Sequence, residues 1–289
     1  MIIAAGGTGG HIYPGIAVAH EFLSRDAAND VLFVGTARGL ENTIVPREGF
    51  RLEHVEASAL KNVTLARRVA GVLALPKGFL TALGILRRYD PDVVVGVGGY
   101  ASGPILLMAA LARRPTLVIE PNAMPGFTNR MLARFVTAAA VTFDESLAWF
   151  GRKGVVTGNP VRSDFAGLVP AARGACTRLL VFGGSQGSRA LNNAMIAALP
   201  LLKTSIDSGR LSIVHQTGPG ELERVRAAYA DAGVAAEVVP FIERMMDAFG
   251  AADLLLCRSG ATTVAEVAVA GKAAIFVPFP QAADDHQRR

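Results

Sequence analysis

Short apolar runs rich in β-branched residues alternate with longer Ala- and Leu-rich segments along the whole chain. Near-continuous apolar runs are typical of strands in a parallel sheet that is buried on both faces, and the longer segments between them suit crossover helices. The predicted strands are Ile2–Ala5, Val31–Gly35, Val93–Val97, Thr116–Ile119, Ala138–Thr142, Leu179–Phe182, Ser212–Gln216, Ala236–Val239, Leu254–Cys257 and Ala274–Val277. The pattern therefore predicts an α/β fold with doubly wound parallel sheets.

An internal repeat indicates two domains. The segment IIAAGGTGGH (Ile2–His11) is matched by LLVFGGSQGS (Leu179–Ser188), and each is a strand that runs into a glycine loop and a helix. Two doubly wound domains are more economical than one very wide sheet. The turn-forming Gly158-Asn159-Pro160 places the boundary between domains 1–160 and 161–289. The final residues, 284–289, resemble the start of another helix, so we expect a truncated chain.

Composition excludes several protein classes. The chain has 289 residues, of which 51% are hydrophobic and 18% charged, with a net charge of +5. A chain this apolar can offset its ordering entropy by burial, which excludes intrinsic disorder. Cys176 and Cys257 lack the spacing of a disulfide framework or a metal site, and we expect both to be small buried side chains in a reducing compartment.

One stretch is long enough to cross a bilayer. Residues 93–112 carry no charge over twenty positions. However, the stretch contains Gly96, Gly98, Gly99, Ser102, Gly103 and Pro104, which would break a lipid-exposed helix. A buried strand, a glycine turn and a helix opened by Pro104 explain the segment better. We predict neither a transmembrane helix nor a secretory signal, because no basic segment precedes the first apolar run.

Glycine-rich loops follow four of the predicted strands: Gly6–Gly10, Gly96–Gly103, Gly183–Gly187 and Ser259-Gly260. A loop that opens a helix presents backbone N–H groups at the positive end of the helix dipole, which is a natural phosphate site. For any single loop, glycines that merely let a helix pack on the sheet are an equal alternative. Four such loops at carboxyl ends of strands together favour a nucleotide-type ligand in a cleft between two domains.

The loops do not match the common nucleotide motifs. The first loop departs from the G-x-G-x-x-G spacing, the second strand ends without an acidic residue, and Glu41 comes too late to hold a ribose. None of the loops is followed by Lys-Ser or Lys-Thr, which argues against a P-loop. In the segment Arg258–Glu266, backbone N–H groups of Gly260–Thr263 could face a diphosphate and Glu266 a ribose. Glu266 could equally be a favourable helix-start charge, and its position alone decides for neither.

Six motifs in one order carry a family resemblance: GGTGGHIYPGIAVA (6–19), GVGGYASGP (96–104), EPNAMPGFTNR (120–130), GNPVR (158–162), GGSQGSRALN (183–192) and CRSGATTVAE (257–266). The chain resembles the MurG family, bacterial transferases that move N-acetylglucosamine from UDP onto lipid-linked muramoyl-pentapeptide. The resemblance implies a GT-B fold, in which two Rossmann-like domains face each other across a cleft. It also implies an inverting reaction from UDP-GlcNAc as substrate, without a cofactor or an obligatory metal.

The resemblance assigns the donor mainly to the second domain and the acceptor and membrane surface to the first. The implied donor-binding residues are Thr8, Gly9, Gly10, Asn122, Arg162, Ser185, Ile242, Ala261, Thr262, Thr263, Val264, Ala265, Glu266 and Gln287. Ser185 and residues 261–263 would hold the diphosphate, and Arg162 would supply positive charge near it. Ile242 would bind the uracil and Glu266 the ribose. Gln287 would bind the sugar hydroxyls. The chain departs from the family in having Ile119-Glu120-Pro121-Asn122 for His-Glu-Gln-Asn, and it lacks the helices that follow Gln287 in the family.

The transfer itself needs two kinds of group. Negative charge develops on the UDP β-phosphate as the anomeric bond breaks, and helix N-termini with Arg162 can stabilise it. The acceptor hydroxyl must lose a proton, and His11 lies in a loop that borders the presumed cleft, so His11 is the candidate general base. The alternative, that His11 orients the loop or binds phosphate, remains open.

The basic charge is concentrated in one stretch. Residues 57–89 contain no acid, and their basic residues Lys61, Arg67, Arg68, Lys77, Arg87 and Arg88 are interleaved with apolar ones. By sequence alone an ordinary helix that covers the sheet is favoured. The lipid-linked acceptor of the family favours instead a helix on an anionic membrane surface, with Lys77, Phe79, Leu80 and Leu83 in contact. Nucleic acid is not expected as a partner, because stacking aromatic residues are lacking.

The resemblance thus implies a peripheral enzyme of peptidoglycan synthesis at the cytoplasmic face of the plasma membrane, serving cell-wall biogenesis, cell shape and division. Its partners would be UDP-GlcNAc, undecaprenyl-linked muramoyl-pentapeptide and the membrane surface. Two alternatives place a sugar nucleotide in the same cleft: a UDP-sugar epimerase with two Rossmann-like domains, and a non-catalytic membrane-bound binder of sugar nucleotides.

Overall fold

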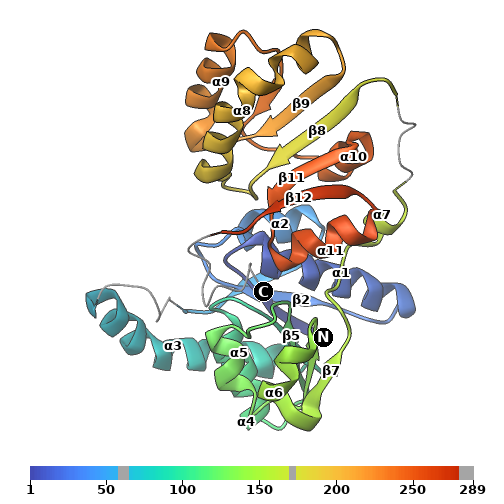
Figure 1. Ribbon diagram of the computed structural model, residues 1–289. Coiled ribbons are helices and arrows are strands. Elements are labelled where there is room, and N and C mark those ends of the chain that lie inside the picture. Colours follow the sequence, from blue (N-terminus) through green and yellow to red (C-terminus); the bar gives the residue numbers. More distant parts are fainter. Residues whose placement is uncertain (58–64, 169–173, 280–289) are drawn as a thin grey trace. The chain divides into compact units, whose positions relative to one another are not determined.

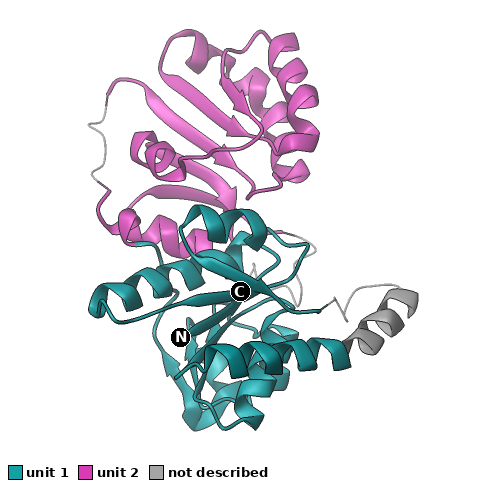
Figure 2. Ribbon diagram, turned by 180° about the vertical axis from the view of Figure 1, so that it is seen from behind, with its two compact units in different colours: residues 1–162 teal, residues 163–289 magenta. Residues whose placement is uncertain are grey.

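The computed structural model describes residues 1–57, 65–168 and 174–279, with all side chains there except those of residues 65–75. Two compact units, Met1–Arg162 and Ser163–Arg289, divide the chain (Figure 2). The division falls after Arg162 rather than after Pro160, so that the chain's GNPVR motif belongs to unit 1 as a whole. The predicted helix start at 284–289 lies outside the described residues.

Unit 1 is built on a parallel sheet with helices packed against it (Figure 1). The described residues form seven strands in this sheet, in the order β3-β2-β1-β4-β5-β6-β7. The strands are β1 (Ile2–Ala5), β2 (Leu32–Gly35), β3 (Arg51–His54), β4 (Val94–Gly98), β5 (Thr116–Glu120), β6 (Ala138–Val141) and β7 (Gly154–Val156). The sequence pattern missed β3 and β7. Both lie at sheet edges and are largely unburied, so neither needs a continuous apolar run.

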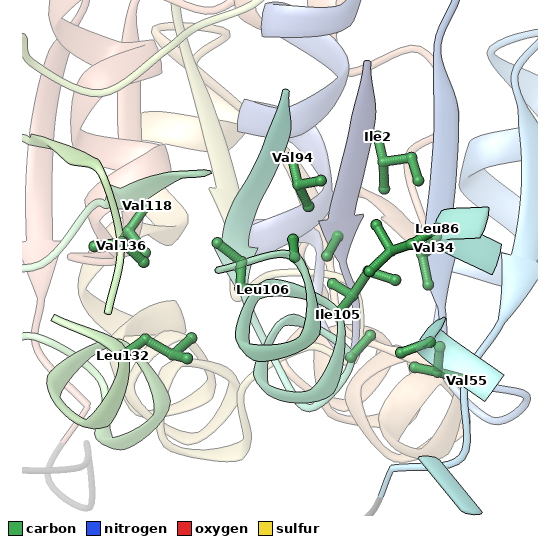
Figure 3. Packing of buried hydrophobic residues seen from close by; sticks show 14 of the residues in the cluster. Ile2, Val34, Val55, Leu86, Val94, Ile105, Leu106, Val118, Leu132 and Val136 are labelled. Atoms are coloured by element: carbon green, nitrogen blue, oxygen red, sulfur yellow. The ribbon is translucent and has the colours of Figure 1, made fainter. Parts of the chain in front are cut away.

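Helices cover both faces of this sheet: α1 (Gly9–Arg25), α2 (Glu41–Arg47), α3 (Leu65–Tyr89), α4 (Ser102–Leu111), α5 (Phe127–Leu132) and α6 (Leu147–Phe150), with single-turn 3₁₀ helices at Asp144–Ser146 and Gly151–Lys153. Successive residues of a strand point to opposite faces, and β1 shows this directly. Ile2 and Ala4 join the core under α3, α4 and α5 (Figure 3), whereas Ile3 and Ala5 join the core under α1 and α2.

Helix α4 begins earlier than the sequence suggested. Its first residue is Ser102, two positions before the proline that was expected to open it. The buried Ser102 Oγ lies 2.9 Å from the Ala4 carbonyl and 2.8 Å from the Gly98 carbonyl, and it accepts the Gly98 N–H at 3.2 Å. These contacts fix the strand-to-helix turn before Pro104 is reached.

Unit 2 repeats the architecture with a parallel sheet in the order β10-β9-β8-β11-β12, again counted over the described residues. Its strands are β8 (Thr177–Phe182), β9 (Leu211–Gln216), β10 (Glu237–Val239), β11 (Leu254–Arg258) and β12 (Ala273–Val277). Its helices are α7 (Ser163–Ala166), α8 (Arg189–Asp207), α9 (Leu222–Asp231), α10 (Met245–Ala251) and α11 (Ala261–Val269), with a 3₁₀ turn at Pro219–Glu221. The doubly wound α/β prediction is confirmed for both units.

The core of unit 2 has two parts. On one face, Leu179 and Val181 of β8 pack with Leu191, Met195 and Leu199 of α8 and with side chains of α9. Elsewhere Phe249 of α10 packs against two other rings, Phe165 with centroids 5.1 Å apart and Phe182 at 5.6 Å. The buried Cys257 lies on β11, where burial raises the pKa of its thiol to about 12. Cys176 is half-buried, so the expectation of two buried cysteines is correct for Cys257 alone.

The strand order creates the same switch point twice. In unit 1, β1 lies between β2 and β4, and in unit 2, β8 lies between β9 and β11. All neighbouring strands are parallel, so the loops after β1, β2 and β4 lie together at the carboxyl ends of the strands, as do those after β8, β9 and β11. Open α/β sheets bind ligands at the carboxyl ends of their strands. Each unit therefore brings its own glycine loops together.

Candidate functional site

The first glycine loop leads directly into α1. Gly7 has φ +89°, a left-handed conformation that favours glycine, and α1 begins at Gly9. The exposed Thr8 precedes the helix, and its carbonyl accepts the N–H of His11 at 3.1 Å and of Ile12 at 3.2 Å. Thr8, Gly9 and Gly10 thus lie at the positive end of the α1 dipole, as the phosphate-loop interpretation requires.

A buried carboxylate lies directly beneath this loop. Glu41, at the start of α2, is fully buried. Its Oε2 accepts the Gly7 N–H at 2.8 Å, and its Oε1 accepts the Thr36 N–H at 2.8 Å and the Thr36 hydroxyl at 2.9 Å. Glu41 therefore joins the loop after β1 to the loop after β2.

His11 lies between the first and second glycine loops. Its ring is half-buried and packs on the backbone of Gly98, where a Cβ would come within 2.7 Å of the imidazole Cδ2. Gly98 and the following Gly99 have φ +115° and +81°, and a Cβ on Gly99 would overlap the carbonyl oxygen of Gly6. The two loops are therefore in close backbone contact, and His11 is held at their junction.

Arg162 is placed beside the same loop. Its guanidinium stacks over the ring of Tyr13, 4.4 Å from the centroid, and that ring in turn lies close to the Cα of Gly9. An arginine keeps its charge at all physiological pH values, and stacking limits its motion. Arg162 therefore supplies a fixed positive charge near the start of α1, on unit 1 rather than in the second domain to which the sequence boundary assigned it.

A second buried carboxylate organises the loop that follows β5. Both the backbone N–H and the side-chain Nδ2 of Asn122 donate to Glu120 Oε1 at 3.0 Å. Oε2 of Glu120 accepts the Gly126 N–H at 2.9 Å and Asn129 Nδ2 at 2.8 Å. Ser146 Oγ donates to the Asn122 carbonyl at 2.7 Å. Asn122 is thus held firmly, whereas the neighbouring Ile119 and Pro121, which replace polar family residues, are buried.

In unit 2, the loop Gly183–Ser188 is built on neutral groups. The buried Gln216 accepts the Gly183 N–H at 3.4 Å, and its Nε2 donates to the carbonyls of Gly184 at 3.0 Å and Pro240 at 3.3 Å. Gly184 and Gly187 have φ +90° and +72°, and a Cβ on Gly187 would overlap the Thr217 carbonyl. Ser185 is half-buried in this loop, at the approach to α8.

A buried polar network supports the Gly183–Ser188 loop from below. Asn192 Nδ2 donates to the Thr217 carbonyl at 3.0 Å, so its Oδ1 is an acceptor, and it lies 3.1 Å from His215 Nε2. The Nε2 of His215 therefore carries the proton, and Nδ1 accepts from the Tyr229 hydroxyl at 3.1 Å. Burial lowers the pKa of His215 to about 4, which keeps the imidazole neutral, and it raises the pKa of Tyr229.

The fourth loop leads into α11. Gly260 is its N-cap residue, and Ala261, Thr262, Thr263, Val264 and Ala265 form the first turns, all half-buried. Glu266 follows on the second turn and is buried. Ile242 lies in the loop between β10 and α10, half-buried. The last predicted donor residue, Gln287, lies outside the described residues.

The predicted membrane residues lie on α3. Ala82, Ile85 and Leu86 face the core, whereas Leu80 is 71% exposed and Phe79 and Leu83 are half-buried. Lys77 is paired with Glu56, and Arg88 with Glu53, which the sequence pattern did not indicate. Lys61 and the side chains of Arg67 and Arg68 are outside the described part of the chain. No helix within the described residues combines the length and the hydropathy needed to cross a membrane.

The sequence missed the residues that act beneath the loops. Glu41, Gln216 and His215 lie outside the loop motifs, in other parts of the chain, whereas Asn192 is the last residue of the 183–192 motif and contacts Thr217 and His215. The sequence offers only a weak signal for them, namely polar residues at the end of an apolar run or at the start of a helix, and their burial is seen only in the structure. Among the described residues, no group of three or more His, Cys, Asp or Glu side chains is arranged to hold a metal ion.

Comparison with protein families agrees with this architecture. The glycosyltransferase family 28 N-terminal domain matches residues 1–141, and the C-terminal domain of the same family matches residues 178–289. The two matches lie in units 1 and 2 respectively.

Named relatives match along the whole chain. The UDP-N-acetylglucosamine–N-acetylmuramyl-(pentapeptide) pyrophosphoryl-undecaprenol N-acetylglucosamine transferase of Pelobacter propionicus is 48% identical, with 100% of this chain and 82% of the relative covered. The protein of the same name from Myxococcus xanthus is 49% identical, with 99% and 75% covered.

The similar solved structures include one relative at substantial sequence identity and one protein that shares only the fold. MurG of Acinetobacter baumannii superposes with a TM-score of 0.73 at 34% identity and covers 99% of this chain and 80% of its own. A UDP-GlcNAc 2-epimerase from Neisseria meningitidis, solved with UDP-GlcNAc bound, has a TM-score of 0.66 but 13% identity, with 95% and 81% covered, which shows the fold alone. The family resemblance found in the motifs is thus confirmed. The chain belongs to glycosyltransferase family 28 and, within it, to the MurG family of N-acetylglucosamine transferases.

Proposed function

We propose that the chain transfers N-acetylglucosamine from UDP-GlcNAc to undecaprenyl-linked muramoyl-pentapeptide, converting lipid I to lipid II in peptidoglycan synthesis. The observation that carries the proposal is 48% identity over the whole chain to a transferase named for this reaction. The match covers both units and so includes all four glycine loops. An epimerase shares the fold at low identity, so the fold alone does not favour that alternative.

Unit 2 holds the donor. The N–H groups at the starts of α8 and α11 are positive helix ends, suited to the diphosphate, with Ser185 and Ala261–Ala265 beside it. Glu266 accepts the ribose hydroxyls, and the backbone at Ile242 meets the uracil. Negative charge grows on the β-phosphate as the anomeric C–O bond breaks, and these fixed dipoles stabilise it. The family resemblance implies that Arg162, whose guanidinium the Tyr13 ring orients, adds a full positive charge to this stabilisation.

Unit 1 activates the acceptor. The acceptor hydroxyl oxygen forms the new bond to the anomeric carbon while the old C–O bond breaks and its electron pair leaves with UDP, which inverts the configuration. The hydroxyl proton passes to the imidazole of His11. The imidazole of His11 packs directly on Gly98, which has no side chain that would displace the ring. This contact holds the ring in place, so His11 is preorganised to act as a base.

The activity is tested by product analysis. With UDP-GlcNAc and the lipid-linked acceptor, we expect a lipid-linked disaccharide and one UDP for each bond formed. An epimerase would instead convert UDP-GlcNAc to its 2-epimer without acceptor. A non-catalytic binder would bind UDP-GlcNAc in calorimetry on the same sample and form no product. Either of these results would refute the transferase assignment.

Membrane association at the cytoplasmic face is the second part of the proposal. Helices α3, α4 and α5 cover one face of the unit 1 sheet, and they carry the exposed apolar side chains Leu80, Leu111 and Met131. Basic residues Lys77, Arg113 and Arg130 accompany them. The ion pair of Lys77 with Glu56 is exposed and therefore weak, so lipid phosphates can replace it. An apolar surface among basic side chains suits an anionic bilayer.

A pair of matched leucines tests this surface. Leu80 on α3 is 71% exposed and Leu201 on α8 of unit 2 is 84% exposed, so neither contributes much to a core. Burying a leucine is worth about 1.5–3 kcal/mol, so Leu80→Asp should weaken binding to anionic vesicles about tenfold or more. Leu201→Asp introduces the same charge and should leave vesicle binding unchanged. Equal losses in both variants would contradict this placement of the membrane surface.

A further inference from the structure

The buried carboxylate of Glu41 occupies a space that three glycines leave open. A Cβ on Gly6 would come within 2.7 Å of Glu41 Oε1, and a Cβ on Gly39 would overlap Oε2. On Gly35 a Cβ would press against the Glu41 side chain at Cγ. Gly6 lies in the loop after β1, Gly35 ends β2 and Gly39 lies in the loop after β2, so two separate segments of the chain form a space that fits one carboxylate.

Every oxygen of that carboxylate is used to hold loop backbone. Oε2 takes the Gly7 N–H, and Oε1 takes the Thr36 N–H and hydroxyl, with all three distances at 2.8–2.9 Å. Hydrogen bonds to an ionised group are the strong ones. Burying a carboxylate costs free energy unless hydrogen-bond donors surround it, as they surround Glu41. A different loop conformation would remove these donors, so the buried carboxylate favours the observed conformation of the loop.

The fixed loop in turn sets the position of the candidate base. The carbonyl of Gly6 lies against Gly99, and the preceding Gly98 lies under the ring of His11. His11 follows Gly7 by only a few residues and lies on the first turn of α1. The carboxylate therefore fixes both the segment that carries His11 and the backbone on which its ring rests.

From these contacts we infer that Glu41 is a positioning residue for the transfer reaction, which holds the first glycine loop and, through it, His11. The inference rests on the proposed function for its kinetic consequence. Glu41 touches neither donor nor acceptor in this role, so its loss should affect turnover more than donor binding, which depends mainly on unit 2.

Two independent changes disturb the same contact. In Glu41→Gln, the side-chain oxygen can still accept one N–H, but its amide group then faces the other N–H donor, so one loop contact is lost. Gly39→Ala leaves Glu41 in place but adds a methyl group where Oε2 lies. The control is Val45→Ala, which removes a fully buried side chain from the same helix, on the core side, without touching the loop.

The test combines kinetics with amide exchange on the intact protein. In both loop variants we expect kcat to fall about tenfold to a hundredfold, as for a small misplacement of a catalytic group. The KM for UDP-GlcNAc should stay within about threefold of the original value, because uniform donor binding is not removed. Exchange of the Gly7 and Thr36 amides should accelerate. Val45→Ala should lower the melting temperature and leave kcat unchanged.

Two results would overturn the inference: a loss of kcat in Val45→Ala as large as in the loop variants at equal stability, or Gly7 and Thr36 amide exchange that stays unchanged in Glu41→Gln. The exchange measurement needs no turnover. If the original protein forms no lipid-linked disaccharide, the proposed function fails, whereas amide exchange still decides whether Glu41 holds the loop.

Discussion

The two repeated glycine loops, loop one (Gly6–Gly10) and loop two (Gly183–Ser188), begin alike and then diverge. Gly7 and Gly184 occupy equivalent places and have nearly the same φ, +89° and +90°. After them, α1 begins at once at Gly9, whereas the second loop stays open through Gly187 and α8 begins at Arg189 behind the Ser188 cap. Loop two is therefore longer, with more residues between the equivalent glycine and the start of the helix. Similar glycine motifs thus form different ligand surfaces.

The groups beneath the loops differ in charge as well. The Gly7 N–H donates to the carboxylate of Glu41, whereas loop two is held by the neutral amide of Gln216. At loop one the buried carboxylate is occupied by N–H donors of the chain itself, and the start of α1 and the Arg162 guanidinium remain beside it. A neutral amide leaves the helix dipole of α8 available to a diphosphate. The comparison suits donor binding at loop two and acceptor chemistry at loop one.

The largest expected effect comes from His11→Gln. Glutamine cannot take up a proton, so kcat should fall by about 10²–10⁴, the usual contribution of general acid–base catalysis. Affinity for UDP in calorimetry should not change, because unit 2 binds the nucleotide. If UDP affinity falls instead and kcat is retained, His11 is a phosphate ligand and the division of roles between the loops is wrong.

Gln216→Glu tests the charge difference directly. The new carboxylate would face the carbonyls of Gly184 and Pro240, to which Gln216 now donates, and the buried unpaired charge should cost about 3–5 kcal/mol. Urea unfolding measures the loss, and UDP calorimetry should show weaker binding. Gln186→Glu introduces the same charge at an exposed position of the same loop and should change stability by less than about 0.5 kcal/mol. Unchanged stability and UDP affinity in Gln216→Glu would remove the electrostatic contrast.

The sequence pattern predicts the strands that carry these loops but not the contacts beneath the loops. The apolar runs located the strands that carry the loops, because parallel strands buried on both faces leave a continuous hydrophobic signature. The partially exposed edge strands β3 and β7 leave none. Glu41 lies too far along the chain to bind a ribose in a dinucleotide motif, but motif spacing tests only local geometry. The carboxylate of Glu41 contacts Gly7, 34 positions earlier in the chain. Contacts of this kind depend on tertiary packing, and the sequence pattern does not encode them.

Acid should weaken the support of loop two. Burial lowers the pKa of His215 to about 4, whereas it is near 6.5 in the unfolded chain. Between these values the unfolded state binds more protons, so the free energy of unfolding falls as pH falls from 6.5 to 4, by about 3 kcal/mol in total and about 2 kcal/mol by pH 5. Amide exchange in β8 and β9 at pH 7.5 and 5 measures the loss.

Two controls make this loss specific to unit 2. His215→Gln keeps a donor and an acceptor but does not titrate, so its exchange should depend less on pH. Trp149, the single tryptophan of the chain, lies in unit 1, and its fluorescence follows that unit separately. Equal acid sensitivity in the original protein and in His215→Gln would show that other groups cause it.

The smallest effect is expected for Thr36→Val, which separates the parts of the Glu41 contact. The change removes the hydroxyl that donates to Oε1 at 2.9 Å but keeps the Thr36 backbone N–H at 2.8 Å and the Gly7 N–H at 2.8 Å. Stability should fall by about 1 kcal/mol, the typical worth of one hydrogen bond, and kcat by about threefold at most. Denaturant unfolding and turnover under identical conditions measure both. Because loop one differs from loop two in a charged group that holds backbone, the backbone bonds should matter more than the hydroxyl. A loss of kcat as large as that of Glu41→Gln would show that the Thr36 side chain, and not the tie between Gly7 and the carboxylate, maintains the loop.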